Sequence, residues 1–228
     1  MNHRTWPVLT AATAVFVMAV AGVQVPSVGA PTQTCFGRAP TMIGTRGNDV
    51  LIGKKGKKDV IVGLAGNDRI RGRGGNDIIC GDDGNDRIVG GPGDDRINGS
   101  AGAERLSGGK GPDTLRGGEA NDVIAGGGGR DKMSGGIGAD RLNGGRKIDR
   151  LAGGPDNDRL KGGKGNDRLF GSLGDDVVLA GIGTDHVSGG DGDDSLNTKD
   201  NTGGDTLRGA GGVDNCVADV GDVVHGCP

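Results

Sequence analysis

The chain has 228 residues, 52 of which are Gly, and it carries a formal net charge of −3. It contains no Tyr, one Trp and three Phe, which excludes a conventional core that draws much of its buried area from aromatic side chains. The sequence has no basic stripe with interleaved aromatic residues, which argues against nucleic-acid binding, and no uniform basic run that would favour a membrane surface.

The first thirty residues have the pattern of an export signal. Arg4 supplies a charged start, the stretch from Val8 to Val23 is mostly apolar, and small residues follow up to Ala30. An uncleaved membrane anchor is the alternative, but this apolar run is short for a hydrocarbon core of about 30 Å. We therefore expect residues 1–30 to be a cleaved signal peptide, with an extracellular or cell-envelope location and no membrane insertion after cleavage.

Residues 31–43 precede the first repeat, and we expect them to form an N-terminal cap. Thr41, Met42 and Ile43 have the alternation of a short strand, and Pro40 stands where the repeats carry Asp. A terminal turn that covers the core without binding an ion is typical of a solenoid.

From Gly44 to Asn197 the chain divides into seventeen units, sixteen of nine residues and one of ten. Gly162–Phe170 (GGKGNDRLF) is typical: position six is Asp in every unit except one, which has Glu104, and position eight is always aliphatic or Met. The Gly-rich half permits tight bends with positive φ, and the second half alternates like a very short strand with one inward side chain. Repetition predicts a parallel coil with two units per turn, in which residues 18 apart are stacked.

This stacking brings the position-six carboxylates into two columns. Parallel strands on successive turns lie about 4.8 Å apart, and carboxylates at that spacing repel one another unless a cation neutralises them. Carboxylate and backbone carbonyl oxygens suit Ca²⁺, which accepts 6–8 oxygen ligands, whereas softer metals prefer His or Cys. Since one aliphatic side chain per unit buries little area against the entropy of ordering so much Gly, the sequence predicts folding that depends on the ions.

The array resembles the RTX family of hemolysin-type calcium-binding repeats, which form parallel β-rolls. The resemblance implies an all-β, right-handed parallel β-solenoid over residues 44–197 that binds multiple Ca²⁺ ions. In the family the position-six Asp binds Ca²⁺ together with loop carbonyls of its own turn and the next. By resemblance, this role falls on Asp49, Asp59, Asp68, Asp77, Asp86, Asp95, Asp113, Asp122, Asp131, Asp140, Asp149, Asp158, Asp167, Asp176, Asp185 and Asp194.

Several units depart from the repeat. Ala120, Lys147 and Asp156 replace the Gly of position four, and Glu104 is one methylene longer than Asp. We expect these sites to be the weakest. Position seven is Arg or Lys in nine units, and these outward side chains are expected to neutralise the Asp columns in part.

Residues 198–228 lose the register and then resume it in Gly209–Val217, so we expect an irregular final repeat and a C-terminal cap. Asp205 and Asp214 are weaker candidate ligands there. The four cysteines allow three pairings, and zinc is the rival interpretation, but no C-x-x-C or His cluster supports it. In an exported chain we expect the disulfides Cys35–Cys80 and Cys216–Cys227.

Catalytic motifs are not found. His3, His186 and His225 are isolated, and neither a zinc-protease motif, a nucleophile elbow nor a P-loop occurs. The sequence therefore predicts a secreted, non-catalytic structural or interaction module that folds on binding Ca²⁺. Two alternatives stay open: an accessory module of an extracellular enzyme or adhesin, and a Gly-rich disordered stalk.

Overall fold

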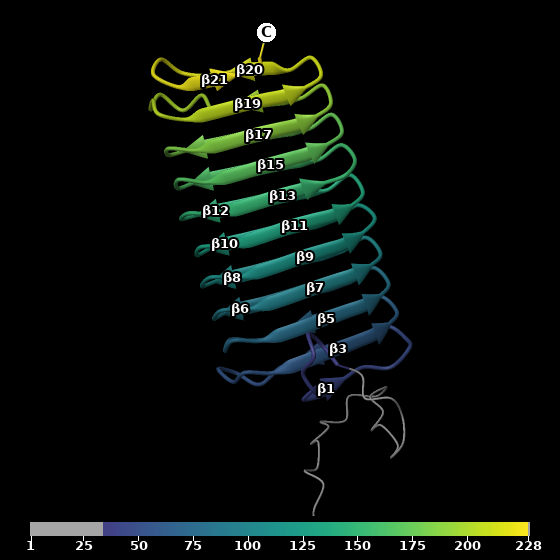
Figure 1. Cartoon of the computed structure of the whole chain (residues 1–228). Helices are drawn as coiled ribbons and strands as arrows, with labels where there is room; N and C mark the ends of the chain where they lie inside the picture. The colour runs from purple at the N-terminus through teal and green to yellow at the C-terminus, as the bar shows by residue number, and fades with distance from the viewer. Residues whose placement is uncertain (1–33, 228) are drawn as a thin grey trace, which may run out of the picture.

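The computed structural model describes residues 34–227, which wind into a long parallel β-solenoid (Figure 1). The disordered stalk is therefore the wrong interpretation of the Gly-rich composition. The described residues form strands and turns, and none of them forms a helix that could cross a membrane. The predicted signal peptide lies outside the described residues.

Two sheets make up the walls of the solenoid, and every strand pairs with the strands two places away in the chain. The sheet of eleven odd-numbered strands contains β1 (Met42–Ile43), β3 (Val60–Ala65), β5 (Ile78–Asp83), β7 (Arg96–Ala101), β9 (Thr114–Glu119), β11 (Lys132–Ile137), β13 (Arg150–Gly154), β15 (Arg168–Leu173), β17 (His186–Asp191), β19 (Thr206–Gly211) and β21 (Val223–His225). The sheet of ten even-numbered strands contains β2 (Val50–Ile52), β4 (Arg69–Arg71), β6 (Arg87–Pro92), β8 (Arg105–Lys110), β10 (Val123–Gly128), β12 (Arg141–Arg146), β14 (Arg159–Lys164), β16 (Val177–Ile182), β18 (Ser195–Asn197) and β20 (Asn215–Val217).

The register confirms that two units complete one turn. Leu106 in β8 pairs with Ile88 in β6 and with Ile124 in β10, each 18 residues away. Most strands are six residues long rather than the three that the alternation predicted. The Gly-rich backbone also pairs with the next turn, as Gly109 does with Gly127, so each strand continues beyond its alternating half.

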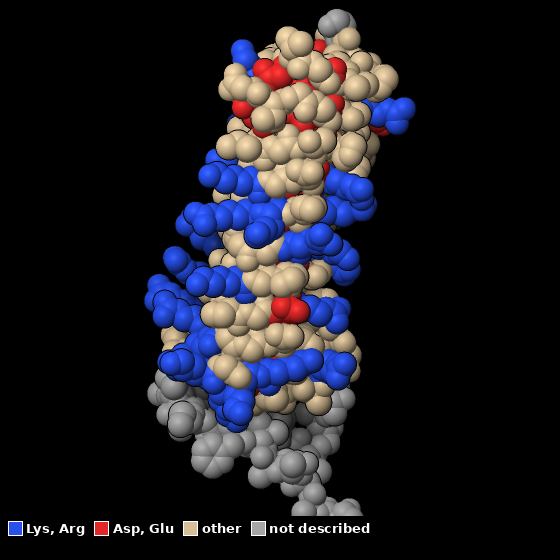
Figure 2. Space-filling view, turned by 90° about the vertical axis from the view of Figure 1, so that its left-hand side faces the viewer, with Lys and Arg blue, Asp and Glu red and all other residues tan. Residues whose placement is uncertain are grey.

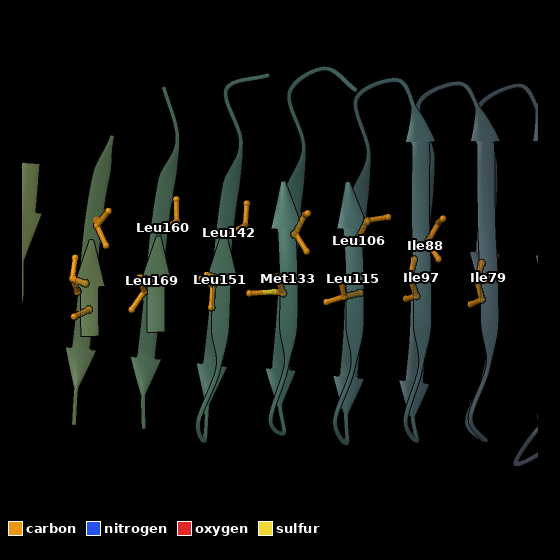
Figure 3. Packing of buried hydrophobic residues seen from close by; sticks show 14 of the residues in the cluster. Ile79, Ile88, Ile97, Leu106, Leu115, Met133, Leu142, Leu151, Leu160 and Leu169 are labelled. Atoms are coloured by element: carbon orange, nitrogen blue, oxygen red, sulfur yellow. The ribbon is translucent and has the colours of Figure 1, made fainter. Parts of the chain in front are cut away.

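The core is a narrow line of position-eight side chains from both sheets (Figure 3). Each unit contributes one buried aliphatic or Met side chain, and Leu207 continues the line after the last regular repeat. Fully burying one such side chain contributes about 1.5–3 kcal/mol. Seen along the rod, the core is thin compared with the amount of backbone that it has to hold.

The turns depend on backbone that L-residues avoid. Position four has positive φ in nearly every unit, for example 138° at Gly93, where an added Cβ would collide with the Gly75 carbonyl of the previous turn. Ala120, Lys147 and Asp156 keep this geometry, with φ of 68°, 84° and 78°. The solenoid thus imposes the glycine conformation on residues for which it is strained.

A second apolar cluster lies outside the odd-numbered sheet at its N-terminal end. The predicted disulfide Cys35–Cys80 is confirmed, and Cys35 and Phe36 cover Val60 and Ile78. Those two aliphatic residues occupy position seven, which carries exposed Arg or Lys in nine of the units. Their apolar side chains fit this cover.

At the other end the sheets continue past Asn197. Thr206 pairs with His186, a separation of 20 rather than 18, so the loss of register is a two-residue insertion. The predicted Cys216–Cys227 disulfide is confirmed and joins β20 to the end of the chain beyond β21.

Candidate metal centre

The sixteen predicted ligands are all buried, and they form the two columns that the repeat predicts. From Asp68 to Asp194 each of these Asp side chains is at most 2% exposed. Position six lies in the turn just before each strand. One column therefore consists of the residues that precede odd-numbered strands, and the other of those that precede even-numbered strands.

One oxygen of each carboxylate is fixed by the backbone. The N–H of Asp149 donates to Asp167 Oδ1 at 2.8 Å, and the same bond recurs from the position-six residue of one turn to the Asp of the next. The described residues contain sixteen such bonds of 2.7–3.0 Å. They lock the rotamer of each Asp and determine where its second oxygen points.

The second oxygen, Oδ2, is buried without any partner. This holds for Asp68, Asp77, Asp86, Asp95, Asp113, Asp122, Asp131, Asp140, Asp149, Asp158, Asp167, Asp176, Asp185, Asp194, Asp205 and Asp214. A buried polar group without a partner carries its full desolvation cost, and for an ionised oxygen this cost is larger still. A regular row of unpaired carboxylate oxygens therefore calls for a cation.

A backbone carbonyl oxygen of the next turn lies near the unpaired atom. A Cβ built on Gly144, at position one, would lie 2.6 Å from both Asp149 Oδ2 and the carbonyl oxygen of Gly162 one turn later. A similar closeness to the second carboxylate oxygen recurs at the position-one glycines from Gly44 to Gly209, and Ala180 holds this position in the unit of Asp185. Where both atoms are close, the site combines a carboxylate oxygen with a carbonyl oxygen of the next turn.

Within residues 34–227 no three His, Cys, Asp or Glu side chains converge on one point. A bound metal would therefore depend on backbone carbonyls for most of its ligands. Such an all-oxygen, carbonyl-rich donor set fits Ca²⁺ and does not fit zinc, which takes nitrogen or sulfur ligands at closed structural sites.

The family model of the RTX calcium-binding nonapeptide repeat matches nine overlapping segments that run from residue 41 to residue 196. The chain belongs to this RTX family. No curated protein matches the chain. The RTX match ends before Asp205 and Asp214, so their place in the columns comes from the structure alone.

From Asp68 to Asp205, burial raises the pKa of the carboxyl groups in the columns and is the largest cause of the shift. Neighbouring carboxylates raise the pKa further at most of these positions, and the hydrogen bond from the backbone offsets part of the shift. The pKa rises from 3.8 to about 6 for Asp68, Asp86, Asp95 and Asp140, and to about 7 for Asp113, Asp149, Asp158, Asp176 and Asp185. A proton and a cation are thus competing ways to relieve the same buried charge.

The protein itself closes three of the four column ends, whereas Asp214 at the last end keeps an unpaired Oδ2. Asp49 Oδ2 accepts hydrogen bonds from the Thr45 N–H at 2.6 Å and from the Thr45 hydroxyl at 3.0 Å. Asp59 Oδ2 accepts one from the Lys54 N–H at 2.6 Å. At the other end of the column that contains Asp205, Asp222 Oδ1 accepts the Asp205 N–H at 3.0 Å, and its Oδ2 accepts the Asp219 N–H at 2.8 Å. Asp49 and Asp59 therefore need a cation less than the other predicted ligands.

Asp205 and Asp214 were underestimated from the sequence. Asp205 Oδ1 accepts the N–H of Asp185 at 2.7 Å, Asp214 Oδ1 accepts that of Asp194 at 3.0 Å, and both Oδ2 atoms are unpaired. The signal was present in the Asp205-Thr206-Leu207 triplet, which repeats the Asp-x-aliphatic pattern. A two-residue insertion hid it from a strict count of nine.

Glu104 breaks the regular pattern. Both of its carboxylate oxygens are buried without a hydrogen-bond partner, whereas each column Asp has one oxygen bonded. Burial raises the pKa of Glu104, and the nearby carboxylate of Asp122 raises it further. The extra methylene thus leaves this carboxylate without the hydrogen bond that holds each column Asp, and weaker ion binding at Glu104 stays a prediction.

The expectation that position-seven arginines neutralise the columns is wrong. Arg150 and Arg168 are exposed on the outer wall, while Asp149 and Asp167 point inward with Oδ2 unpaired. Alternation along the strand puts positions six and seven on opposite sides of the wall. The column geometry persists beside Ala120, Lys147 and Asp156, so weaker ion binding there stays a prediction.

Proposed function

We propose that this RTX protein is an exported, non-catalytic scaffold that binds a row of Ca²⁺ ions along each carboxylate column and folds as they bind. The observation that carries the proposal is the series of sixteen buried Asp Oδ2 atoms without a partner. Membership of the RTX family and two disulfides suggest an extracellular protein.

In this proposal each oxygen has a separate task. Oδ1 of Asp167 accepts the N–H of Asp149 and joins two turns of the solenoid, and Oδ2 is a ligand of the ion. The ion supplies positive charge that cancels the carboxylates and links neighbouring turns through their carbonyl oxygens. The ligands are the predicted Asp residues together with Asp205 and Asp214, with Asp49 and Asp59 the least important.

We expect folding to be coupled to ion binding because the small apolar core has to offset the cost of burying a carboxylate in every unit. The core gives each unit one aliphatic side chain, while the same unit buries one carboxylate with an unpaired oxygen. Ions that bind only the folded chain shift the equilibrium toward it by mass action. Without ions, repulsion and desolvation along the columns oppose folding.

Far-UV circular dichroism of the full chain, titrated with CaCl₂ and reversed with EGTA, tests this function. We expect a coil spectrum in EGTA that changes cooperatively to β as calcium is added, with MgCl₂ much less effective because Mg²⁺ prefers a stricter octahedron. A β spectrum in EGTA that calcium leaves unchanged would show that the ions are dispensable. A coil spectrum in both conditions would remove the scaffold altogether.

Export is part of the same proposal and has its own test. N-terminal sequencing of the protein recovered outside the producing cells should begin near residue 30. A chain recovered from the cells with Met1 intact would contradict it.

A further inference from the structure

One edge of the solenoid is strongly basic. We define the basic edge as the turns that join each even-numbered strand to the following odd-numbered strand, together with the strand residues that flank them at positions two, three and seven of the repeat, from Lys54 to Arg168. Figure 2 looks onto this side and shows rows of Lys and Arg on either side of the turns. The exposed cations are Lys54, Lys55, Lys57, Lys58, Arg73, Arg96, Lys110, Arg130, Lys132, Arg146, Lys147, Arg150, Lys164 and Arg168.

These fourteen cations face a single exposed carboxylate on the same edge, Asp94. The opposite edge, which joins odd-numbered to even-numbered strands over the same turns, differs. It carries five arginines at position seven and three exposed carboxylates, Asp83, Glu119 and Asp156. The positive charge is therefore a property of one edge rather than of the repeat.

The cations of the basic edge are stacked on one another. Lys132 pairs in register with Arg150, and Arg150 with Arg168, on turns about 4.8 Å apart. Like charges placed opposite each other in a sheet destabilise it. In the described part of the chain these three side chains form no ion pair with a carboxylate. The fold does not require them, since Thr114 occupies the same position one turn before Lys132.

A groove of about 530 Å³ runs over this stack. Its walls include Arg130, Lys132, Arg150, Arg168 and His186, and the buried column residues Asp131 and Asp149 lie beneath them. Those two carboxylates belong to a column, so bound Ca²⁺ would cancel their negative charge beneath the groove. The groove is therefore most positive when the columns are loaded.

We propose that the basic edge binds a linear acidic polysaccharide lying along the rod, and that calcium loading strengthens this binding. The second clause rests on the proposed calcium function. Six turns separate β3 from β15, so the edge is about 29 Å long at about 4.8 Å per turn. Cations repeated at each turn complement carboxylate or sulfate groups repeated along an extended sugar chain.

Aromatic content favours a polysaccharide over a nucleic acid. Single-stranded nucleic acids bind proteins largely by stacking bases on aromatic side chains. The described residues contain two aromatic side chains, Phe36 and Phe170, and each already has an arginine over its ring, Arg96 at 4.3 Å and Arg150 at 5.2 Å. The basic edge offers charge at regular intervals without a stacking surface.

Fluorescence anisotropy of the full chain with a labelled heparin oligosaccharide tests the proposal. The edge variant is Lys132→Gln, Arg150→Gln and Arg168→Gln. The matched control is Arg105→Gln, Arg141→Gln and Arg159→Gln, which removes three position-seven charges from the opposite edge. We expect affinity in CaCl₂ to fall at least about 10-fold for the edge variant and less than about 3-fold for the control. The control charges lie on the opposite edge, a six-residue strand or about 20 Å away, which is beyond a Debye length of about 8 Å.

Several outcomes would overturn it. Equal losses of affinity in the two variants would mean that the sugar responds only to the net charge of the protein. Tighter binding of oligothymidylate or of phosphatidylglycerol vesicles than of the sugar would assign the edge to another partner. Equal affinity in CaCl₂ and in EGTA would remove the calcium clause. Circular dichroism of the same variants separates the two proposals: an edge variant that folds normally with calcium leaves the calcium function intact whatever the sugar does.

Discussion

Asp59 and Asp167 belong to the same column, six turns apart, and their second oxygens have different surroundings. Asp59 Oδ2 accepts the Lys54 N–H at 2.6 Å, whereas Asp167 Oδ2 is buried without a partner. The end of the column is satisfied by a local N–H donor, and its middle is not. The comparison indicates that the middle of this column depends on something outside the polypeptide, while the ends of the same column do not.

The largest effect is expected from closing one site in the middle. In Gly162→Ala the new Cβ would lie 2.6 Å from Asp167 Oδ2 and against the Ala180 carbonyl oxygen, so it enters the space of the ion. Ala180 holds the same position one turn later, so the fold accepts the methyl group and the cost falls on ion binding. We expect the calcium midpoint in a circular dichroism titration to rise about 10-fold. Gly47→Ala is the control, because its Cβ would meet nothing closer than the Thr45 hydroxyl at 3.7 Å.

The two carboxylates compared above, Asp59 and Asp167, can each be replaced by the amide of Asn. Asp167→Asn keeps an oxygen to accept the Asp149 N–H but replaces the charged ligand atom, so the calcium midpoint should rise about 3- to 10-fold. Asp59→Asn keeps an acceptor for Lys54 and should change the midpoint less than about 2-fold. Equal shifts in the two variants would contradict the distinction between end and middle.

The columns to which Asp59 and Asp167 belong could be predicted from the sequence, but the difference between the two residues could not. The period of nine with Asp at position six and an aliphatic residue at position eight is enough to predict the stacking of residues 18 apart, the columns and the core. It could not reveal that Thr45 and Lys54 supply donors to the first carboxylates, because these bonds depend on the path of a non-repeating turn. The two-residue insertion before Asp205 likewise disguised two members of the columns.

The basic edge could not be predicted from the sequence for a related reason. Lys132, Arg150 and Arg168 are 18 residues apart, and the units between them place their own charges on the other edge. Apart from Lys54, Lys55, Lys57 and Lys58, no basic run appears in the chain, but folding brings every second unit to the same edge and stacks these units. Successive units of nine residues place their charges on opposite edges of the solenoid. A charge pattern examined at a period of nine therefore combines two separate surfaces.

Acid should replace calcium in part. Burial raises the pKa of Asp149 and Asp185 from 3.8 to about 7 in the folded chain. The protonated carboxyl therefore favours folding, with a contribution fully present below 3.8 and lost as the pH rises through about 7. In EGTA the β signal should increase as the pH is lowered from about 8 to about 5, and the calcium midpoint should rise over the same range. A β signal independent of pH in EGTA would contradict the buried charge.

The smallest effect concerns the backbone. Lys147 has φ of 84°, a conformation that costs an L-residue about 1–2 kcal/mol. Lys147→Gly should raise the free energy of unfolding by about 1 kcal/mol in urea at saturating calcium, after the flexibility that Gly adds to the unfolded chain. Lys164→Gly removes the same charge from a strand of the same edge and should lower stability instead.

Counting the bound ions tests the central claim most directly. Equilibrium dialysis of the full chain against labelled calcium, with circular dichroism on the same samples, should show roughly fifteen ions, as expected if ions are shared between stacked carboxylate loops. Binding and β structure should appear over the same range of calcium. One or two ions per chain, or many ions that bind without a change in the spectrum, would contradict the account.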